Sequence, residues 1–152
     1  MQRDRIVVEI QRRINSIKIA NGYEFDIRYV YRNPEGEPSP DLMPMTNIFE
    51  FPSTTVDETM RRGAKQKPVY KKFFRVAMEH WYNSDSMGET SRDIMQFLKA
   101  ARLAIFSDGQ TLGGLASLVV EEEESRVYRP LQNVVGIGEV LAIQFTEDFN
   151  NL

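Results

Sequence analysis

Hydrophobic residues recur along the chain first with a helical period and then with the period of a strand. Near the N-terminus isoleucines are three or four residues apart, and charged residues fall mostly elsewhere on the helical wheel: Ile6, Ile10, Ile14 and Ile17. This spacing predicts an amphipathic helix that ends at Asn21-Gly22, because both residues tolerate a left-handed C-cap. In residues 23–32 tyrosine, phenylalanine and isoleucine occupy alternate positions, which predicts a half-buried strand.

The middle of the chain alternates between loop and strand signals. Residues 33–44 contain four prolines, which lack the donor that a strand ladder needs, and are predicted to form a loop. A short strand is predicted at 46–51 and a long polar loop at 52–68. Residues 69–82 read as a further strand, with apolar side chains on both faces. We expect the strands at 46–51 and 69–82 to be antiparallel neighbours.

The second half repeats the order of helix and then strands. Thr90 and Asp93 resemble a capping box, and the apolar stripe that follows predicts a helix that stops at Asp108-Gly109. Residues 112–120 fit a short helix or a strand, 121–128 an exposed strand or hairpin arm, and 134–145 a last strand. The expected fold is α+β, an antiparallel or mixed sheet of four to five strands with two to three helices packed on one face. One domain is expected over residues 1–152, with a long loop at about 52–68.

Composition supports a globular chain synthesised in the cytosol. The 152 residues are 41% hydrophobic and 27% charged, which are ordinary values for a folded domain. Cysteine is absent, so disulfides and thiolate chemistry are excluded, and a reducing compartment fits. The sequence has neither an apolar run of membrane-spanning length nor the apolar core of a signal peptide, so no membrane partner is expected.

Charge argues against a protein whose main task is to grip nucleic acid. The net charge is −3 and the pI is near 5.3, whereas such proteins concentrate lysine and arginine to neutralise phosphates. Basic residues do cluster locally: Arg61, Arg62, Lys65, Lys67, Lys71 and Lys72. The ordinary interpretation of this cluster is a solvated loop and the start of a strand.

Nucleophilic and phosphate-binding motifs are missing. His80 is the only histidine, and neither a cysteine nor a Gly-x-Ser-x-Gly elbow accompanies it, so we interpret it as a packed or edge residue. Gly136-Ile137-Gly138 lacks the third glycine of a dinucleotide loop and predicts a kink, a bulge or a close backbone approach. Gly113-Gly114 has no Lys-Ser/Thr after it and predicts a turn.

Four consecutive carboxylates form the most conspicuous charge run: Glu121, Glu122, Glu123 and Glu124. On an extended segment they point alternately to both sides, so they cannot converge on one ion, and the spacing of a calcium loop is absent. A solvated acidic strand is the ordinary interpretation; an acidic surface facing a repelled polyanion or a basic partner is the alternative. Other acidic residues fall in separate loops and offer no acid–base pair. We therefore expect no catalytic, cofactor or metal site, and no enzyme.

The order of these signals resembles that of the small tail terminator and tail completion proteins of tailed bacteriophages. In that family an N-terminal amphipathic helix runs into an aromatic strand, as it does here through Asn21-Gly22-Tyr23. A loop, paired strands and a helix follow, and here the helix at 90–108 leads into the passage 105–115, IFSDGQTLGGL. A closing strand similar to residues 138–145 completes the pattern. The resemblance covers most of the chain, although the proline-rich loop and residues 52–68 depart from it.

The resemblance implies a structural virion protein without a cofactor. Its members form a homo-oligomeric ring, commonly a hexamer, that caps the tail tube and provides the docking surface for a neck or head-completion protein. The genomic DNA passes through the lumen without specific binding, so an acidic or neutral lumen is an advantage. This places the chain in the virion, at the head-proximal end of the tail, after assembly in the host cytoplasm. Glu121–Glu124 could line the lumen or an interface, and a subunit or tail-tube contact is assigned to Arg61, Arg62, Lys65 and Lys67.

Other interpretations remain open at this point. A head–tail connector, a neck adaptor or the terminator of a phage-derived tail-like particle would show the same pattern. A small monomeric protein-binding domain, whose proline-rich loop contacts a partner, belongs to a different class. A nuclease or hydrolase would require clustered carboxylates, which the sequence does not offer.

Overall fold

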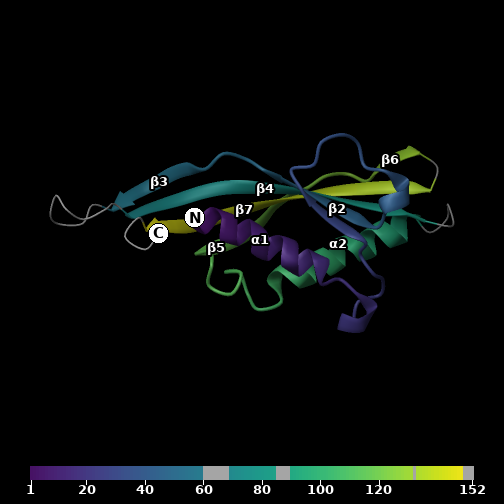
Figure 1. Cartoon of the computed structure of the whole chain (residues 1–152), viewed down its shortest axis with the longest axis horizontal. Coiled ribbons are helices and arrows are strands. Elements are labelled where there is room, and N and C mark those ends of the chain that lie inside the picture. Colours follow the sequence, from purple (N-terminus) through teal and green to yellow (C-terminus); the bar gives the residue numbers. More distant parts are fainter. Residues whose placement is uncertain (60–68, 85–89, 132, 149–152) are drawn as a thin grey trace.

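Both helices pack against the same face of one mixed sheet (Figure 1). The computed structural model describes residues 1–59, 69–84, 90–131 and 133–148. Its helices are α1 (Gln2–Asn15) and α2 (Thr90–Phe106), with short 3-10 turns η1 (Ile19–Asn21) and η2 (Pro40–Leu42). Its strands are β1 (Tyr29–Arg32), β2 (Met45–Glu50), β3 (Thr54–Thr59), β4 (Val69–Asn83), β5 (Leu118–Glu124), β6 (Tyr128–Leu131) and β7 (Val134–Asp148).

The antiparallel pair β4 and β7, 15 residues each, forms the centre of the sheet. The strand order is β1-β2-β4-β7-β5, with β3 also paired to β4 and β6 also paired to β7. Only β1 and β2 run parallel among these pairs. The α+β prediction, with a mixed sheet and helices on one face, therefore agrees with the structure. The expected count of four to five strands is wrong, since the described part of the chain already forms seven.

The core lies between the helices and one face of the sheet. The isoleucines that predicted the first helix are all fully buried: Ile6, Ile10, Ile14 and Ile17. They meet the buried side of β4, where Phe74, Val76 and Met78 alternate with outward-facing residues. Each such side chain contributes about 1.5–3 kcal/mol when it is removed from water. Burial therefore holds α1 on the sheet more than helix propensity does.

The predicted antiparallel pairing of the strands at 46–51 and 69–82 is confirmed. β2 and β4 are antiparallel neighbours, with Thr46 opposite His80 and Ile48 opposite Met78. The predicted strand at 23–32 is wrong for its first half, because only Tyr29–Arg32 joins the sheet. In the first half, Phe25 and Ile27 enter the core, and the N–H of Ile27 bonds to the Ile17 carbonyl at 2.8 Å. In residues 23–28 apolar and polar side chains therefore alternate because Phe25 and Ile27 close the core. These residues do not pair with a strand.

The predicted loop at 52–68 is also partly wrong. Thr54–Thr59 forms edge strand β3 on β4, with Thr54 opposite Phe73 and a bulge between Thr55 and Asp57. Edge strands tolerate a polar sequence, since only one side of the ladder is paired. Residues 60–68 lie outside the described residues. Near the C-terminus, 112–117 form a turn and β5 begins at Leu118, which resolves the open choice for 112–120.

Candidate functional site

The acidic run forms most of β5, but it does not present one acidic surface. A bulge between Glu121 and Glu123 shifts the register on β7, so that Glu123 lies opposite Val140 and Glu124 opposite Glu139. Glu121 and Glu124 therefore reach the helical side, where both pair with Arg102 of α2; Glu121 Oε1 lies 2.6 Å from Nη2. Glu122 pairs with Arg75 on the other side at 2.6 Å, and this hydrogen bond lowers the pKa of Glu122. Among the described residues, Glu123 alone in the run forms no ion pair.

The basic cluster assigned to an interface cannot be placed in the same way. Arg61, Arg62, Lys65 and Lys67 lie outside the described residues. Lys71 and Lys72 belong to β4, opposite Thr146 and Phe145 of β7, so they extend the sheet and are not part of a loop. The proposed contact between the acidic run and this basic cluster therefore stays a prediction.

The sheet face opposite the helices carries apolar side chains that no helix covers. On β5 Leu118 and Val120 flank the buried Val119 and are 37% and 39% exposed. The same face continues across β7 and β4 with side chains that are half-buried: Val140, Ala142, Ala77 and Phe73. We call these six residues the open apolar strip. Exposed apolar side chains that recur on adjacent strands are typical of a protein interface.

Two hollows open on this face and meet in its middle. One, of about 430 Å³, lies between Trp81, Tyr128 and the Gly136–Gly138 stretch of β7. The other, of about 460 Å³, lies between the 51–54 segment and Arg75. Both are lined by Glu123 and Val140. Gly136 shapes the first hollow, because a Cβ there would stand 2.7 Å from the Trp81 ring, which confirms the predicted close approach.

One end of the open face is closed by a small second core. Met43, Met45, Trp81 and Val134 bury one another, with Tyr31 and Leu42 packed against them. This core folds the proline-rich segment back over β2 and β4. The open apolar strip begins where this cover stops, so the exposed part of the face has a defined boundary.

The free edge of β5 is blocked at its start. The N–H of Val119 donates to the Gln110 carbonyl at 2.7 Å, and Gln110 Nε2 donates to the Val119 carbonyl at 3.4 Å. The bulge at Glu121–Glu123 then interrupts the regular ladder. Both features prevent the addition of a further strand, which is how sheet proteins avoid uncontrolled edge pairing. Contacts through the face of the sheet are therefore more available than contacts through this edge.

His80 proves to be a packed residue, as expected, yet it belongs to a polar chain that the sequence reading missed. His80 Nδ1 lies 2.8 Å from Thr46 Oγ1, and Nε2 lies 2.7 Å from Glu139 Oε1. All three side chains are buried between the sheet and α2, where the imidazole packs 4.8 Å from the Phe97 ring. Thr46 and His80 are both 0% exposed. This geometry orders the core and gives a substrate no access to the histidine.

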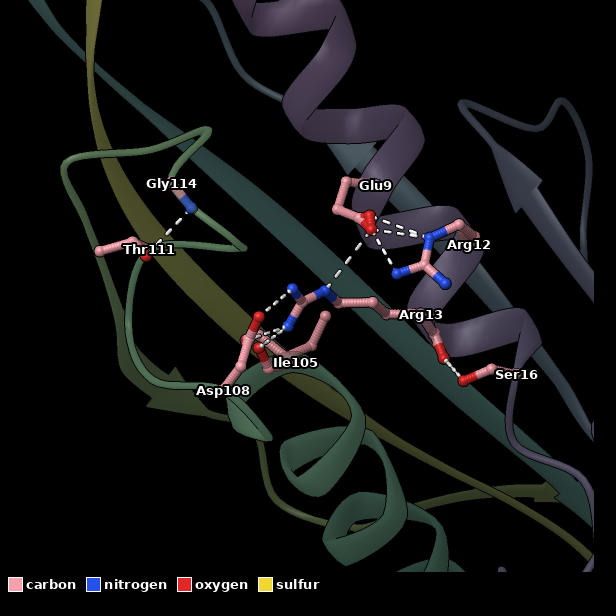
Figure 2. Close-up of polar contacts among 8 residues, drawn as sticks. All are labelled: Glu9, Arg12, Arg13, Ser16, Ile105, Asp108, Thr111 and Gly114. Carbon is pink, nitrogen blue, oxygen red and sulfur yellow. Dashed lines mark hydrogen bonds and ion pairs between the residues drawn. The ribbon is translucent and has the colours of Figure 1, made fainter. Parts of the chain in front are cut away.

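A buried arginine fixes the turn after α2, within the passage that carries the family resemblance. Figure 2 shows Arg13 of α1 reaching the end of α2, where Nη1 donates to the Ile105 carbonyl at 3.0 Å. Its two terminal nitrogens also bind Asp108, at 2.7 and 2.9 Å, and the hydrogen bond lowers the pKa of that carboxyl. The N–H of Gly114 donates to Thr111 Oγ1 at 3.1 Å, and Gly113 and Gly114 both have positive φ. The predicted Gly113-Gly114 turn is thus confirmed and is docked on α1.

The buried polar residues that the sequence analysis did not identify occupy positions where the pattern expects an apolar residue. Glu139 and Glu147 stand in phase with the apolar positions Ile137, Leu141 and Phe145 of β7. Likewise Arg13 stands seven residues after Ile6, on the buried side of α1. A charged residue at an apolar phase indicates a buried polar contact.

Comparison with known proteins does not place the chain in a family. No family model matches it, and no curated protein sequence does either. No helix among the described residues is long and apolar enough to cross a membrane. In the same residues no cluster of three or more histidine, aspartate or glutamate side chains could hold a metal ion.

Proposed function

We propose that the chain is a structural virion protein, a tail terminator that forms a homo-oligomeric ring through the open face of its sheet. The single observation that carries the proposal is the open apolar strip, with its two hollows, on a face that no helix covers. A stable ring needs an apolar, well-packed contact of this kind on each subunit. The order of elements, which resembles that of phage tail terminators, supplies the biological setting.

The charges on the open face support the same assignment. Arg75 of β4 and Glu122 of β5 neutralise each other across the middle of the strip, since Arg75 lies opposite Ala142 of the intervening β7, and Arg75 also lies 4.8 Å from the Phe73 ring centroid. Glu123 is left beside both hollows as the one carboxylate of the run that is available to a neighbour. A strip that holds one internal ion pair and one further carboxylate favours a contact whose register is fixed.

The remaining parts of the proposal follow from this ring. It is a hexamer that caps the tail tube, receives a neck or head-completion protein, and lets genomic DNA pass without specific binding. The net charge of −3 favours a lumen that does not hold phosphates. Arg61, Arg62, Lys65 and Lys67 are proposed to contact a neighbouring subunit or the tail tube. The protein acts in the virion and has no enzymatic activity.

Electron microscopy of the purified chain, alone and mixed with tail tubes, tests this function. Rings with a central channel, and caps at one end of the tubes, are the expected images. A head–tail connector would instead bind the portal or neck and leave tube ends bare, and a monomeric binding domain would give neither image. Rings that do not bind to tail tubes would refute the terminator role but would leave the proposed ring assembly standing.

A further inference from the structure

The outer edge of β1 is the sheet edge that carries no feature against further pairing. Among the described strands β1 ends the strand order, so its far side pairs with no strand. The other edge strands are each protected: β3 and β5 by a bulge, β5 also by its contact with Gln110, and β6 by Pro130. β1 keeps an unbroken register with β2 and consists of Tyr-Val-Tyr-Arg, which favours a strand.

The unpaired backbone groups of this edge belong to Val30 and Arg32. The N–H of Asn33 donates to the Ile48 carbonyl of β2 at 2.6 Å. Because backbone groups alternate in direction along a strand, Tyr31 and Tyr29 also face β2, and the two residues between them and Asn33 face away. Outside the ladder with β2, no hydrogen bond reaches the backbone of Val30 or Arg32 within the described part of the chain. The edge therefore offers donors and acceptors to an added strand.

A groove of about 460 Å³ runs between this edge and the exposed flank of α1. Val8 of α1, which is 49% exposed, and Tyr29 of β1 provide apolar surface on its two walls. Arg32 Nη1 lies 2.7 Å from Asp4 Oδ1 of α1, which holds strand and helix together. A segment that pairs with β1 would therefore also find side-chain contacts on a preformed wall.

The charge of the groove is positive. Its charged lining residues are Arg12 and Arg28, and the other lining residues are neutral. Arg12 is neutralised by Glu9, whose carboxylate accepts from Nε at 2.7 and 3.0 Å. Arg28 donates to the Asp41 carbonyl at 2.7 Å and lies 5.9 Å from the Tyr29 ring centroid, yet no described carboxylate forms an ion pair with it. Arg28 is thus available to an acidic group beside the edge.

We propose that β1 binds an extended acidic segment of a partner protein as an added strand. Backbone hydrogen bonds to Val30 and Arg32 provide the affinity, and Arg28 selects a carboxylate of the partner. A second copy paired through its own β1 fits less well, because β1 and Arg28 bring positive charge and no acid. The proposal goes beyond the ring, which uses the open apolar strip and not this edge.

Fluorescence anisotropy with the full chain and a labelled peptide, TEVEVEVT, tests the binding. The peptide places its acids on one face and its valines on the other, as an added strand requires. The basic peptide TKVKVKVT should bind at least about tenfold more weakly. The acidic peptide methylated at all of its backbone amides should not bind. Absence of binding by the acidic peptide, or equal binding by either control peptide, would overturn the proposal.

Variants of the edge separate backbone pairing from side-chain contact. Val30→Pro removes an outward N–H, while the ladder with β2 stays intact, and should abolish binding. Val30→Ala keeps the N–H and should bind nearly as the parent does. Should the proline variant not fold, Arg28→Glu provides the test: it should weaken the acidic peptide at least about tenfold and favour the basic one. Lys99→Glu, at an exposed site on α2 outside the groove, is the matched control, and equal binding by Arg28→Glu and Lys99→Glu would overturn the proposal.

Hydrogen exchange and light scattering identify the site and exclude a second copy. In the complex the amides of Val30 and Arg32 should exchange more slowly, and protection confined to other strands would overturn the proposal. A fall in the mass of the chain alone on Val30→Pro would show that a second copy occupies the edge, which would also overturn it. The double variant Leu118→Lys with Val120→Lys should bind the peptide as the parent does, so failure of the ring and failure of this proposal are distinguishable.

Discussion

Replacing Arg13 by alanine should loosen the turn that follows α2. The guanidinium is 8% exposed, and it is the donor to the Ile105 carbonyl at the end of the helix. After truncation this acceptor stays buried without a partner, which costs about 2 to 3 kcal/mol. The ion pair with Asp108 adds little, because that carboxylate is 49% exposed and solvent screens it.

For a domain of this size the loss corresponds to a melting temperature about 4 to 12 °C lower, measured by differential scanning calorimetry. Arg12→Ala is the matched control on the same helix. Its side chain is 67% exposed and, within the described part of the chain, pairs with Glu9 alone, so the unfolding free energy of this variant should stay within about 0.5 kcal/mol of the parent value. Asp108→Asn should fall between the two variants.

Hydrogen exchange locates the effect. Arg13→Ala should increase exchange at residues 105–117 more than in β4 and β7, because the guanidinium holds that turn on α1 (Figure 2). The reasoning would be refuted if Arg13→Ala and Arg12→Ala were equally stable, or if exchange in the turn were unchanged.

Three further predictions concern the buried network, acid and the basic segment. Glu139→Ala leaves His80 buried without its partner at Nε2 and should lower the free energy of unfolding by about 3 to 5 kcal/mol in urea titrations; a loss below about 1 kcal/mol would contradict the network. The hydrogen bond from Arg32 lowers the pKa of Glu50 in the folded chain. The unfolding free energy should therefore stay constant from pH 7 to about pH 5. It should fall below about pH 4, where Glu50 of the unfolded chain binds a proton before Glu50 of the folded chain does. Greater stability at pH 3 than at pH 6 would contradict this sign. Reversing Arg61 and Arg62 to glutamate should weaken assembly in sedimentation velocity, more at 50 than at 300 mM salt, and equal assembly would exclude them from the interface.

Elements with a strong period could be predicted from the sequence, and elements that depend on tertiary contacts could not. β4, α2 and β7 carry their period over many residues, so the pattern identifies them with nearly correct bounds. The predicted end of the first helix at Asn21-Gly22 is wrong, because α1 ends at Asn15 and the left-handed Gly22 caps the separate 3-10 turn η1. β3 is polar and short, and its ladder with β4 rather than its own residues makes it a strand. Residues 23–28 show the reverse case, since Phe25 and Ile27 alternate like a strand while they seal the core.

The candidate site follows the same division. The sequence identified Glu121–Glu124 as a charge run, but the bulge that sends Glu121 and Glu124 to Arg102 depends on the register with β7. Charge counting alone therefore could not tell which carboxylate stays available. The open apolar strip was hidden for a similar reason, because Leu118 and Val120 reveal an uncovered face only once the helices are known to lie on the other side (Figure 1).

Molar mass from size-exclusion chromatography with light scattering tests the central claim, which is ring assembly through the open apolar strip. The parent should elute with a mass near six times the 17.6 kDa of one chain, and Leu118→Lys with Val120→Lys should elute as a folded monomer. The control is Leu103→Lys on α2, where the side chain is 54% exposed on the helical side, and it should keep the mass of the parent. A parent that is monomeric at tens of micromolar, or a double variant that still forms the ring, would contradict the account.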